Sequence, residues 1–123
     1  MAVKWVVLIH EDFDPEFNRL PEKVQDELLA HAKMLQTFGP TLGRPWVDTL
    51  NGSRHANMKE LRFTAANGVW RVAFAFDQDR RAILLACGDK SVRSEKRFYR
   101  TLIQKADKRF DDHLARSKKK REG

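Results

Sequence analysis

Two arginines, Arg62 and Arg71, lie in runs of residues whose alternation fixes the direction of each side chain. In the runs 58–64 and 69–76, large apolar residues occupy alternate positions. These core-facing residues are Leu61 and Phe63 in the first run, and Trp70, Val72, Phe74 and Phe76 in the second. Successive side chains of a strand point to opposite faces, so both arginines point away from the core. Guanidinium groups stay protonated and bind phosphate oxygens bidentately, which predicts a phosphate-binding pair on an exposed surface.

A second interpretation of the arginine pair is purely structural. Glu60 shares the face of Arg62, and Asp77 follows the run that carries Arg71, so exposed ion pairs could neutralise both cations. Only alanines share the face of Arg71, so we expect its replacement by alanine to create no cavity and to leave the fold intact. The pattern alone leaves both interpretations open.

Two further polar residues could bind a ligand or move a proton beside this pair. Lys90 lies in the turn 88–91 after an apolar run, where backbone amides and a lysine can meet a ligand. His55 precedes the run 58–64 and can exchange a proton near neutral pH. His31, by contrast, lies on an apolar helical stripe and is predicted to be a packed core residue.

Several kinds of chemistry lack their residues. The sequence has no zinc-ligand spacing, no glycine-rich nucleotide loop and no Ser/His/Asp set, so we expect neither a metal nor another cofactor. The single cysteine, Cys87, cannot form an internal disulfide and is typical of a reducing, cytoplasmic setting. The apolar start of the chain is too short for a bilayer span or a signal peptide, so no membrane association is expected.

Hydrophobic periodicity predicts the elements that position these side chains. Residues 3–9 alternate as a strand, and residues 21–39 form an amphipathic helix. The runs 58–64 and 69–76 form a hairpin around an Asn-Gly turn. The uniformly apolar run 82–87 predicts a strand that is covered on both faces.

The C-terminal third predicts one long helix that begins after Ser94. Apolar residues recur along it at every fourth position, namely Phe98, Leu102, Ala106, Phe110 and Leu114. The stretch 39–57, with three glycines and no sustained period, is predicted to be a long loop.

The order of these elements predicts an α+β domain over residues 1–115. An N-terminal helix and a long C-terminal helix pack on a small antiparallel-rich sheet, made of the N-terminal strand and a three-strand meander. One sheet face needs a helix, whereas the other can stay open. Residues 116–123 predict a flexible basic tail.

Positive charge gathers in the C-terminal third of the chain. The net charge is +7, and residues 90–123 carry 13 Lys and Arg against 5 Asp and Glu. This concentration favours a polyanionic partner, because cations that bind phosphates release condensed counterions. A solvated helix face followed by a loose basic tail is the alternative.

Five segments together resemble a known family. The stretches 57–63, 68–72, 88–91, 95–99 and 106–114 resemble the RelE/ParE superfamily of type II toxins, and within it the phage-derived HigB-like branch. The resemblance covers about residues 51–114, whereas the first strand and helix agree in order and length only. It implies the RelE-like α+β fold predicted above.

The resemblance also implies a function. Toxins of this kind enter the ribosomal A site in the cytoplasm and cut mRNA, and a cognate antitoxin, here expected to be of the helix-turn-helix type, holds them inactive. The chemistry needs no metal when the RNA's own 2′-hydroxyl attacks the adjacent phosphate, but it needs a base, an acid and cations. Arg62 and Arg71 suit charge stabilisation. The candidates for proton transfer are Lys59, His55 and Lys90, and those for RNA binding are Arg93, Lys96, Arg97, Tyr99 and Arg100.

Some residues depart from the family pattern, and two other functions stay open. Tyr99, the only tyrosine, lies on the predicted helix, and whether it reaches the site is open. Trp70 replaces the more usual tyrosine of the strand motif. A ParE-like inhibitor of DNA gyrase would share the fold without a nuclease site, and a non-catalytic nucleic-acid-binding domain would use only the basic helix.

Overall fold

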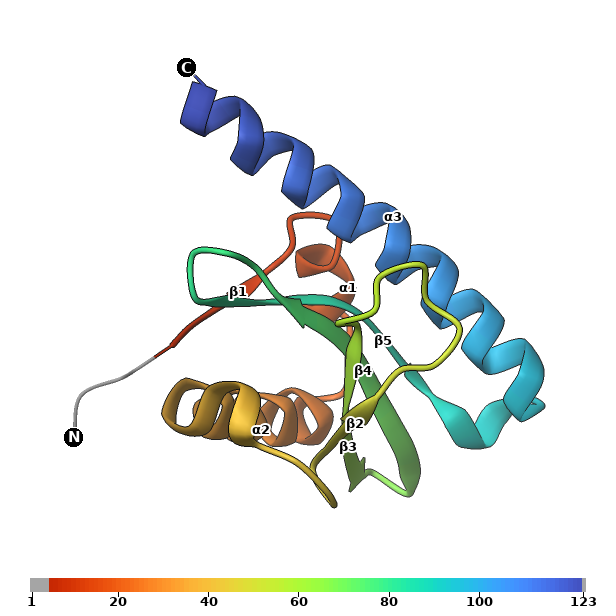
Figure 1. Ribbon diagram of the computed structural model, residues 1–123. Helices are drawn as coiled ribbons and strands as arrows, with labels where there is room; N and C mark the ends of the chain where they lie inside the picture. The colour runs from red at the N-terminus through yellow and green to blue at the C-terminus, as the bar shows by residue number, and fades with distance from the viewer. Residues whose placement is uncertain (1–4, 123) are drawn as a thin grey trace.

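The computed structural model, which describes residues 5–122, has a five-stranded sheet with helices on both faces (Figure 1). The strands are β1 (Val6–Ile9), β2 (Val47–Thr49), β3 (Lys59–Ala65), β4 (Gly68–Phe76) and β5 (Arg81–Asp89). The helices are α1 (Asp14–Asn18), α2 (Glu22–Phe38) and α3 (Glu95–Glu122), with short 3-10 turns at Gly39–Thr41 and Lys90–Val92. The sheet order is β1-β5-β4-β3-β2, and only the β1–β5 pair is parallel. The predicted α+β architecture and the β3–β5 meander are confirmed.

One face of the sheet packs against α2 as the alternation predicted. Val72 and Phe74 of β4 and Leu61 of β3 are fully buried there, together with Leu28 and Leu35 of α2. Val7 and Ile9 of β1 pack against the same cluster, while Val3 of the predicted strand lies outside the described residues.

The opposite face, which the pattern allowed to stay open, is covered by α3, so β5 is covered on both faces as predicted. Ala73 and Ala75 of β4 are fully buried in this second core, and their small side chains let the helix approach the sheet. The predicted helical stripe provides the other side of the contact, with Phe98, Leu102, Ala106 and Phe110 buried and Leu114 partly so. Alanines on a strand form a floor for a helix as well as for a ligand, and here they receive the helix.

The stretch 39–57 is more ordered than a long loop. Its residues 47–49 form β2, which pairs with β3 at the edge of the sheet. Further on, Ser53 donates to Asp107 of α3, and the Arg54 backbone amide donates to the same carboxylate at 3.2 Å. A three-residue strand is too short to show a period of two, so its partner β3 defines it rather than its own sequence.

The residues predicted to form a flexible tail are helical through Glu122. Arg116 binds Glu11 at 2.7 Å, and Arg121 binds Asp79 at 2.9 Å. These pairs, added to the good helix propensity of Lys and Arg, extend α3 past residue 115. No described helix combines the length and the apolar character that a membrane span requires.

Candidate active site

The two arginines singled out in the sequence face each other across neighbouring strands. The β3–β4 register pairs Arg62 directly with Arg71, on the side of the sheet that α3 covers. The two arginines share one face of the sheet, as expected. Arg71, however, is only 7% exposed, because the first turns of α3, which carry Tyr99, cover it. The expected open position of Arg71 was therefore wrong, whereas Arg62 keeps 33% of its side chain exposed.

Glu60 lies between the two guanidinium groups. Its carboxylate oxygens are 3.9 Å from the Nε of Arg71 and 3.9 Å from the Nε of Arg62. Glu60 is only 6% exposed, and burial raises the pKa of its carboxyl although both arginines oppose the shift. The structural interpretation of the arginine pair is thus right about Glu60 and wrong about Asp77, which instead binds Arg81 and His113 at 2.8 Å each.

Tyr99 of α3 reaches this cluster. Its hydroxyl donates a hydrogen bond of 2.9 Å to Oε1 of Glu60. Burial and the neighbouring Glu60 raise the pKa of the phenol, so it stays protonated at neutral pH. Lys90 lies close by, with its Nζ 5.8 Å from the centre of the Tyr99 ring and 2.9 Å from a carboxylate oxygen of Glu95.

A groove of about 600 Å³ opens beside these residues, between the end of β2 and the first turns of α3. Its lining includes Asp48, Thr49, Glu60, Lys96, Tyr99 and Arg100. Lys96 and Arg100 supply positive charge to the wall formed by α3, whereas Asp48, Glu60 and Glu95 supply negative charge to the same groove. The role of Lys96 and Arg100 in RNA binding stays a prediction. Arg93 lines a separate small pocket beside Cys87, and Arg97 is exposed outside the groove.

The structure does not bring Lys59 and His55 to this cluster. Lys59 pairs with Phe74, whose ring lies in the core on the α2 side. Paired residues point to the same face, so the Lys59 side chain lies on the α2 side of the sheet, opposite the arginine pair. The Nε2 of His55 is 2.7 Å from Asp111. Asp111 follows Tyr99 by three helical turns, about 18 Å along α3 at roughly 1.5 Å per residue. Neither residue is placed to share a reacting group with Arg71.

Two carboxylates of the site were not recognised as site residues from the sequence. Glu60 was considered only as an ion-pair partner, although its position two residues before Arg62 already put both on one face. Asp48 lies in a stretch predicted as loop, and its contacts with Arg44 at 3.1 Å and Arg62 at 3.8 Å depend on β2 pairing with β3. No local pattern could have revealed Asp48.

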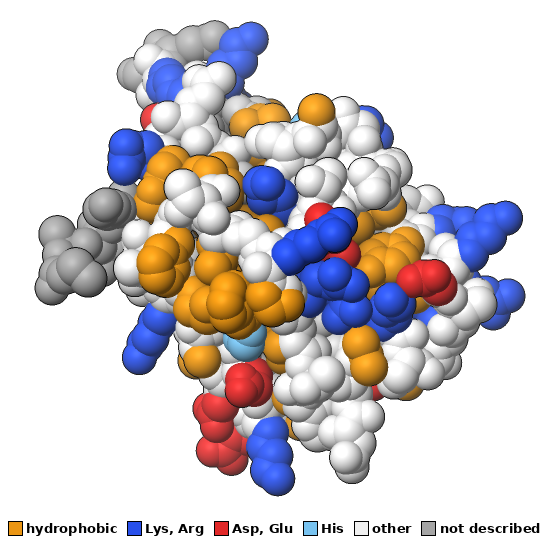
Figure 2. All heavy atoms as spheres, turned by 60° about the horizontal axis from the view of Figure 1, so that its bottom comes forward, with side chains coloured by type: hydrophobic (Ala, Val, Ile, Leu, Met, Phe, Trp, Pro, Cys, Tyr) orange, Lys and Arg blue, Asp and Glu red, His pale blue; other side chains and the backbone are white. Residues whose placement is uncertain are grey.

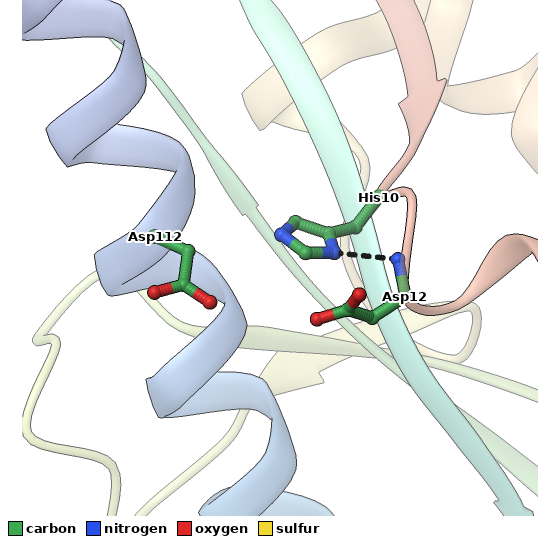
Figure 3. Close-up of side chains that lie close together, drawn as sticks. All are labelled: His10, Asp12 and Asp112. Carbon is green, nitrogen blue, oxygen red and sulfur yellow. Dashed lines mark hydrogen bonds between the residues drawn. The ribbon is translucent and has the colours of Figure 1, made fainter.

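A separate cluster of potential metal ligands lies near the other end of the sheet (Figure 3). His10, Asp12 and Asp112 each offer an atom within 4.8 Å of the others. The Nδ1 of His10 already accepts the Asp12 amide at 3.0 Å, so a neutral ring carries its proton on Nε2 and offers no free lone pair. Burial lowers the pKa of His10, and the nearby cations Arg109 and Arg116 lower it further. The donor set fits a divalent cation poorly, and we assign no metal to it.

Comparison with known proteins places the chain in a family. The model of the family described as phage-derived protein Gp49-like (DUF891) matches residues 15–111. The chain belongs to the Gp49-like family. Two toxin candidates of Mycobacterium tuberculosis H37Rv are related to this Gp49-like chain. It is 43% identical to HigB2 over 93% of its own length and 56% of the relative's. It is 50% identical to HigB3 over 67% of its own length and 69% of the relative's.

Two solved structures share the fold of the Gp49-like chain. The archaeal RelE–RelB complex from Pyrococcus horikoshii matches 72% of this chain and 98% of the solved one, with a TM-score of 0.53 at 19% identity. A mutant of the E. coli toxin RelE in the free state matches 85% of this chain and 97% of the solved one, with a TM-score of 0.56 at 13% identity. The RelE-like fold and the membership of the HigB-like branch, both predicted from the sequence, are confirmed. The Gp49-like chain spans about half the length of HigB2.

Proposed function

We propose that this Gp49-like protein is the toxin of a type II toxin–antitoxin system, and that it cuts mRNA on the ribosome without a metal. The observation that carries the proposal is the hydrogen bond from Tyr99 to Glu60 beside the pair Arg62 and Arg71. It combines a proton acceptor, a proton donor and two permanent cations beside one groove. A gyrase inhibitor or a simple nucleic-acid binder has no need of that combination.

Glu60 and Tyr99 are the proposed proton-transfer groups. Burial raises the pKa of Glu60 toward neutrality, which makes it a stronger base for the proton of the attacking 2′-hydroxyl. As the new bond from O2′ to phosphorus forms and the bond to O5′ breaks, the phenol of Tyr99 gives its proton to O5′. The hydrogen bond between the two side chains then returns the proton from Glu60 to Tyr99. The products are a 2′,3′-cyclic phosphate and a 5′-hydroxyl.

The arginines are proposed to stabilise the negative charge that builds up on the phosphate. Arg71 is buried, so its charge acts in a medium of low dielectric constant and is already oriented before RNA arrives. Its Nε has no hydrogen-bond partner in the described part of the chain. A buried donor of this kind gains a bond when a phosphate oxygen reaches it.

The remaining partners follow from the two cations that α3 contributes to the groove. Lys96 and Arg100 on the wall formed by α3 suit the phosphates that flank the cleavage point in ribosome-bound mRNA. The proposed substrate implies that the protein acts in the cytoplasm. The related archaeal RelE was solved in complex with RelB, and we propose an antitoxin for this protein too, of the helix-turn-helix type. An acidic antitoxin segment that covers the groove would silence the protein without unfolding it.

The test uses the purified protein with translating ribosomes and a defined mRNA. We expect new 5′-hydroxyl ends within A-site codons, 2′,3′-cyclic phosphates on the upstream fragments, and the same rate after chelation of residual zinc. Tyr99→Phe removes the donor with little change in shape and should cut slowly, whereas Glu22→Gln on the exposed start of α2 should cut like the parent. Loss of gyrase supercoiling without cleavage would favour the ParE-like alternative, and RNA binding without cleavage the non-catalytic one.

A further inference from the structure

We propose that Trp46 forms a base-stacking subsite for a nucleotide next to the scissile phosphate, between Arg44, which binds the flanking backbone, and Arg62, which contacts the scissile phosphate. The inference rests on the proposed cleavage of RNA and adds the group that grips a base. We call the four residues Trp46, Arg44, Arg62 and Asp48 the Trp46 subsite.

The backbone at Trp46 is held in place beside the arginine pair. The carbonyl of Trp46 accepts the amide of Arg62 at 2.8 Å, which puts the two residues opposite each other at the end of the β2–β3 ladder. The amide of Trp46 donates to Gly43 at 3.1 Å. Because Arg62 in turn pairs with Arg71, a row runs across three strands from Trp46 to the buried guanidinium.

The ring of Trp46 differs from those of the other two tryptophans. Trp5 packs edge-on against Phe76, and the indole of Trp70 donates to Ala65 at 3.1 Å. Within residues 5–122, the indole of Trp46 makes no hydrogen bond, ring contact or cation–π contact, and the residue is 42% exposed. Its backbone is therefore fixed while its ring is free to receive a partner.

Two arginines neighbour Trp46 along the backbone, Arg44 two residues before it and Arg62 opposite it on β3. Asp48 binds Arg44 at 3.1 Å and lies 3.8 Å from Arg62, so one carboxylate orients both guanidinium groups. Asp48 also lines the groove that Tyr99 lines, so the Trp46 subsite and the candidate active site share this residue. Figure 2 shows one face of the molecule on which Lys and Arg side chains cluster next to apolar ones.

An exposed aromatic ring among cations is the arrangement with which proteins bind single-stranded RNA. Unpaired bases stack on the ring, and the cations bind the phosphates on either side. A surface that docks an apolar protein segment would instead surround the ring with other apolar side chains. Here the residue two before Trp46 and the residue opposite it are both arginines. A nucleotide is therefore the occupant that these neighbours favour.

The experiment combines a change in the protein with a change in the RNA. Ribosomes are programmed with mRNAs that carry, at each position in and next to the A-site codon, either the natural nucleotide or an abasic one. For the parent, Trp46→Ala, Trp46→Phe and Phe38→Ala, we measure the single-turnover cleavage rate and the protein concentration that gives half of the maximal rate. Phe38 is the matched control, an exposed aromatic residue at the end of α2 whose carbonyl accepts the Thr41 hydroxyl.

We expect Trp46→Ala to raise the protein concentration needed for half-maximal cleavage by about 5- to 100-fold, the effect of losing one stacked base. Trp46→Phe should recover most of this loss, and Phe38→Ala should behave like the parent. At one RNA position, the abasic nucleotide should raise this concentration for the parent by as much as Trp46→Ala does on natural RNA. The same abasic nucleotide should not change it further for Trp46→Ala. If Trp46→Ala had the same effect on every abasic template, the subsite would be overturned. It would also be overturned if Trp46→Ala cleaved like the parent but no longer bound the proposed antitoxin, because Trp46 would then contact a protein and not a base. Absence of cleavage by the parent itself would instead overturn the proposed function.

Discussion

The phenol of Tyr99 on α3 donates a hydrogen bond of 2.9 Å to the carboxylate of Glu60 on β3, joining residues that lie 39 positions apart. The bond is the link between a rigid sheet, which carries both arginines, and a helix that packs on its alanine floor. The proposed nuclease site therefore depends on how closely α3 approaches the sheet.

Glu60 should determine the acidic side of the pH–rate profile. A base must be ionised, and burial raises the pKa of Glu60, so cleavage should fall as the pH falls through a value above that of an ordinary glutamate. Glu60→Gln should lose about 10²- to 10⁴-fold in rate and lose this limb of the profile. Single-turnover cleavage on ribosomes between pH 5 and 9 measures both, and an unchanged acidic limb in Glu60→Gln would assign the base to another group.

The two arginines should separate in their effects on stability. Arg71→Ala leaves the buried Glu60 without its nearest buried cation, so we expect the free energy of unfolding to fall by about 1–3 kcal/mol. Arg62→Ala removes a partly exposed cation and should cost less than about 1 kcal/mol. Both variants should lose cleavage. Urea unfolding measures the difference, and equal midpoints for the two variants would mean that Arg71 does not stabilise buried Glu60.

Gly88 should matter because it keeps α3 close to the sheet. It pairs with Arg71 in the β4–β5 ladder, and a Cβ at this position would lie 2.8 Å from the ring of Phe98. Gly88→Ala should push the start of α3 outward and draw Tyr99 away from Glu60. We expect a large loss of cleavage, while Gly43→Ala, where a Cβ meets nothing within 4 Å, should cut like the parent. Full activity of Gly88→Ala would show that the spacing of helix and sheet is not critical.

Asp77 should make stability depend on acid pH. Burial acts to raise the pKa of its carboxyl, but hydrogen bonds from His113, Arg81 and two backbone amides outweigh burial and lower it. A carboxyl with a lowered pKa in the fold stabilises above its unfolded value, near 3.9, and stops doing so as the pH falls through its folded value.

The measurement compares urea unfolding of the parent and Asp77→Asn from pH 7 to pH 3. We expect a gap of about 3 kcal/mol at pH 7, since Asp77 is a buried ion-pair partner, and the gap should begin to narrow as the pH falls below about 4. The exposed Asp79, which binds the same Arg81, is the control, and Asp79→Asn should cost less than about 1 kcal/mol. A gap that does not narrow at all between pH 4 and pH 3 would show that the side chain acts through packing and not through its charge.

Much of this architecture is legible in the sequence because strands and helices impose their own periods. Alternation in β3 and β4 correctly assigned the α2-side core and the shared face of Arg62 and Arg71, and the fourfold spacing from Phe98 correctly assigned the buried stripe of α3. The same alternation also put Lys59 on the core side with Leu61, a signal that argued against its place in the site.

The remaining features depend on contacts between segments far apart in the chain. The burial of Arg71 required knowing that α3 crosses above it, and alanines at 73 and 75 suit either a helix or open solvent. The place of Asp48 depends on the three-residue β2, which is a strand only because β3 lies beside it. His55 was grouped with the site by closeness in sequence, yet the chain carries it to Asp111 farther along α3.

Tyr99 follows the hairpin in the chain, and this order determines when during synthesis the site can exist. Proteins emerge from the ribosome N-terminus first, so β3 and β4 are exposed before α3 has been made. A nascent chain therefore displays both arginines while it still lacks the phenol, and the proposed proton donor Tyr99 arrives only when the helix docks on Ala73 and Ala75. A ribosome that is translating this protein thus does not meet a finished catalytic site on the unfinished chain it carries.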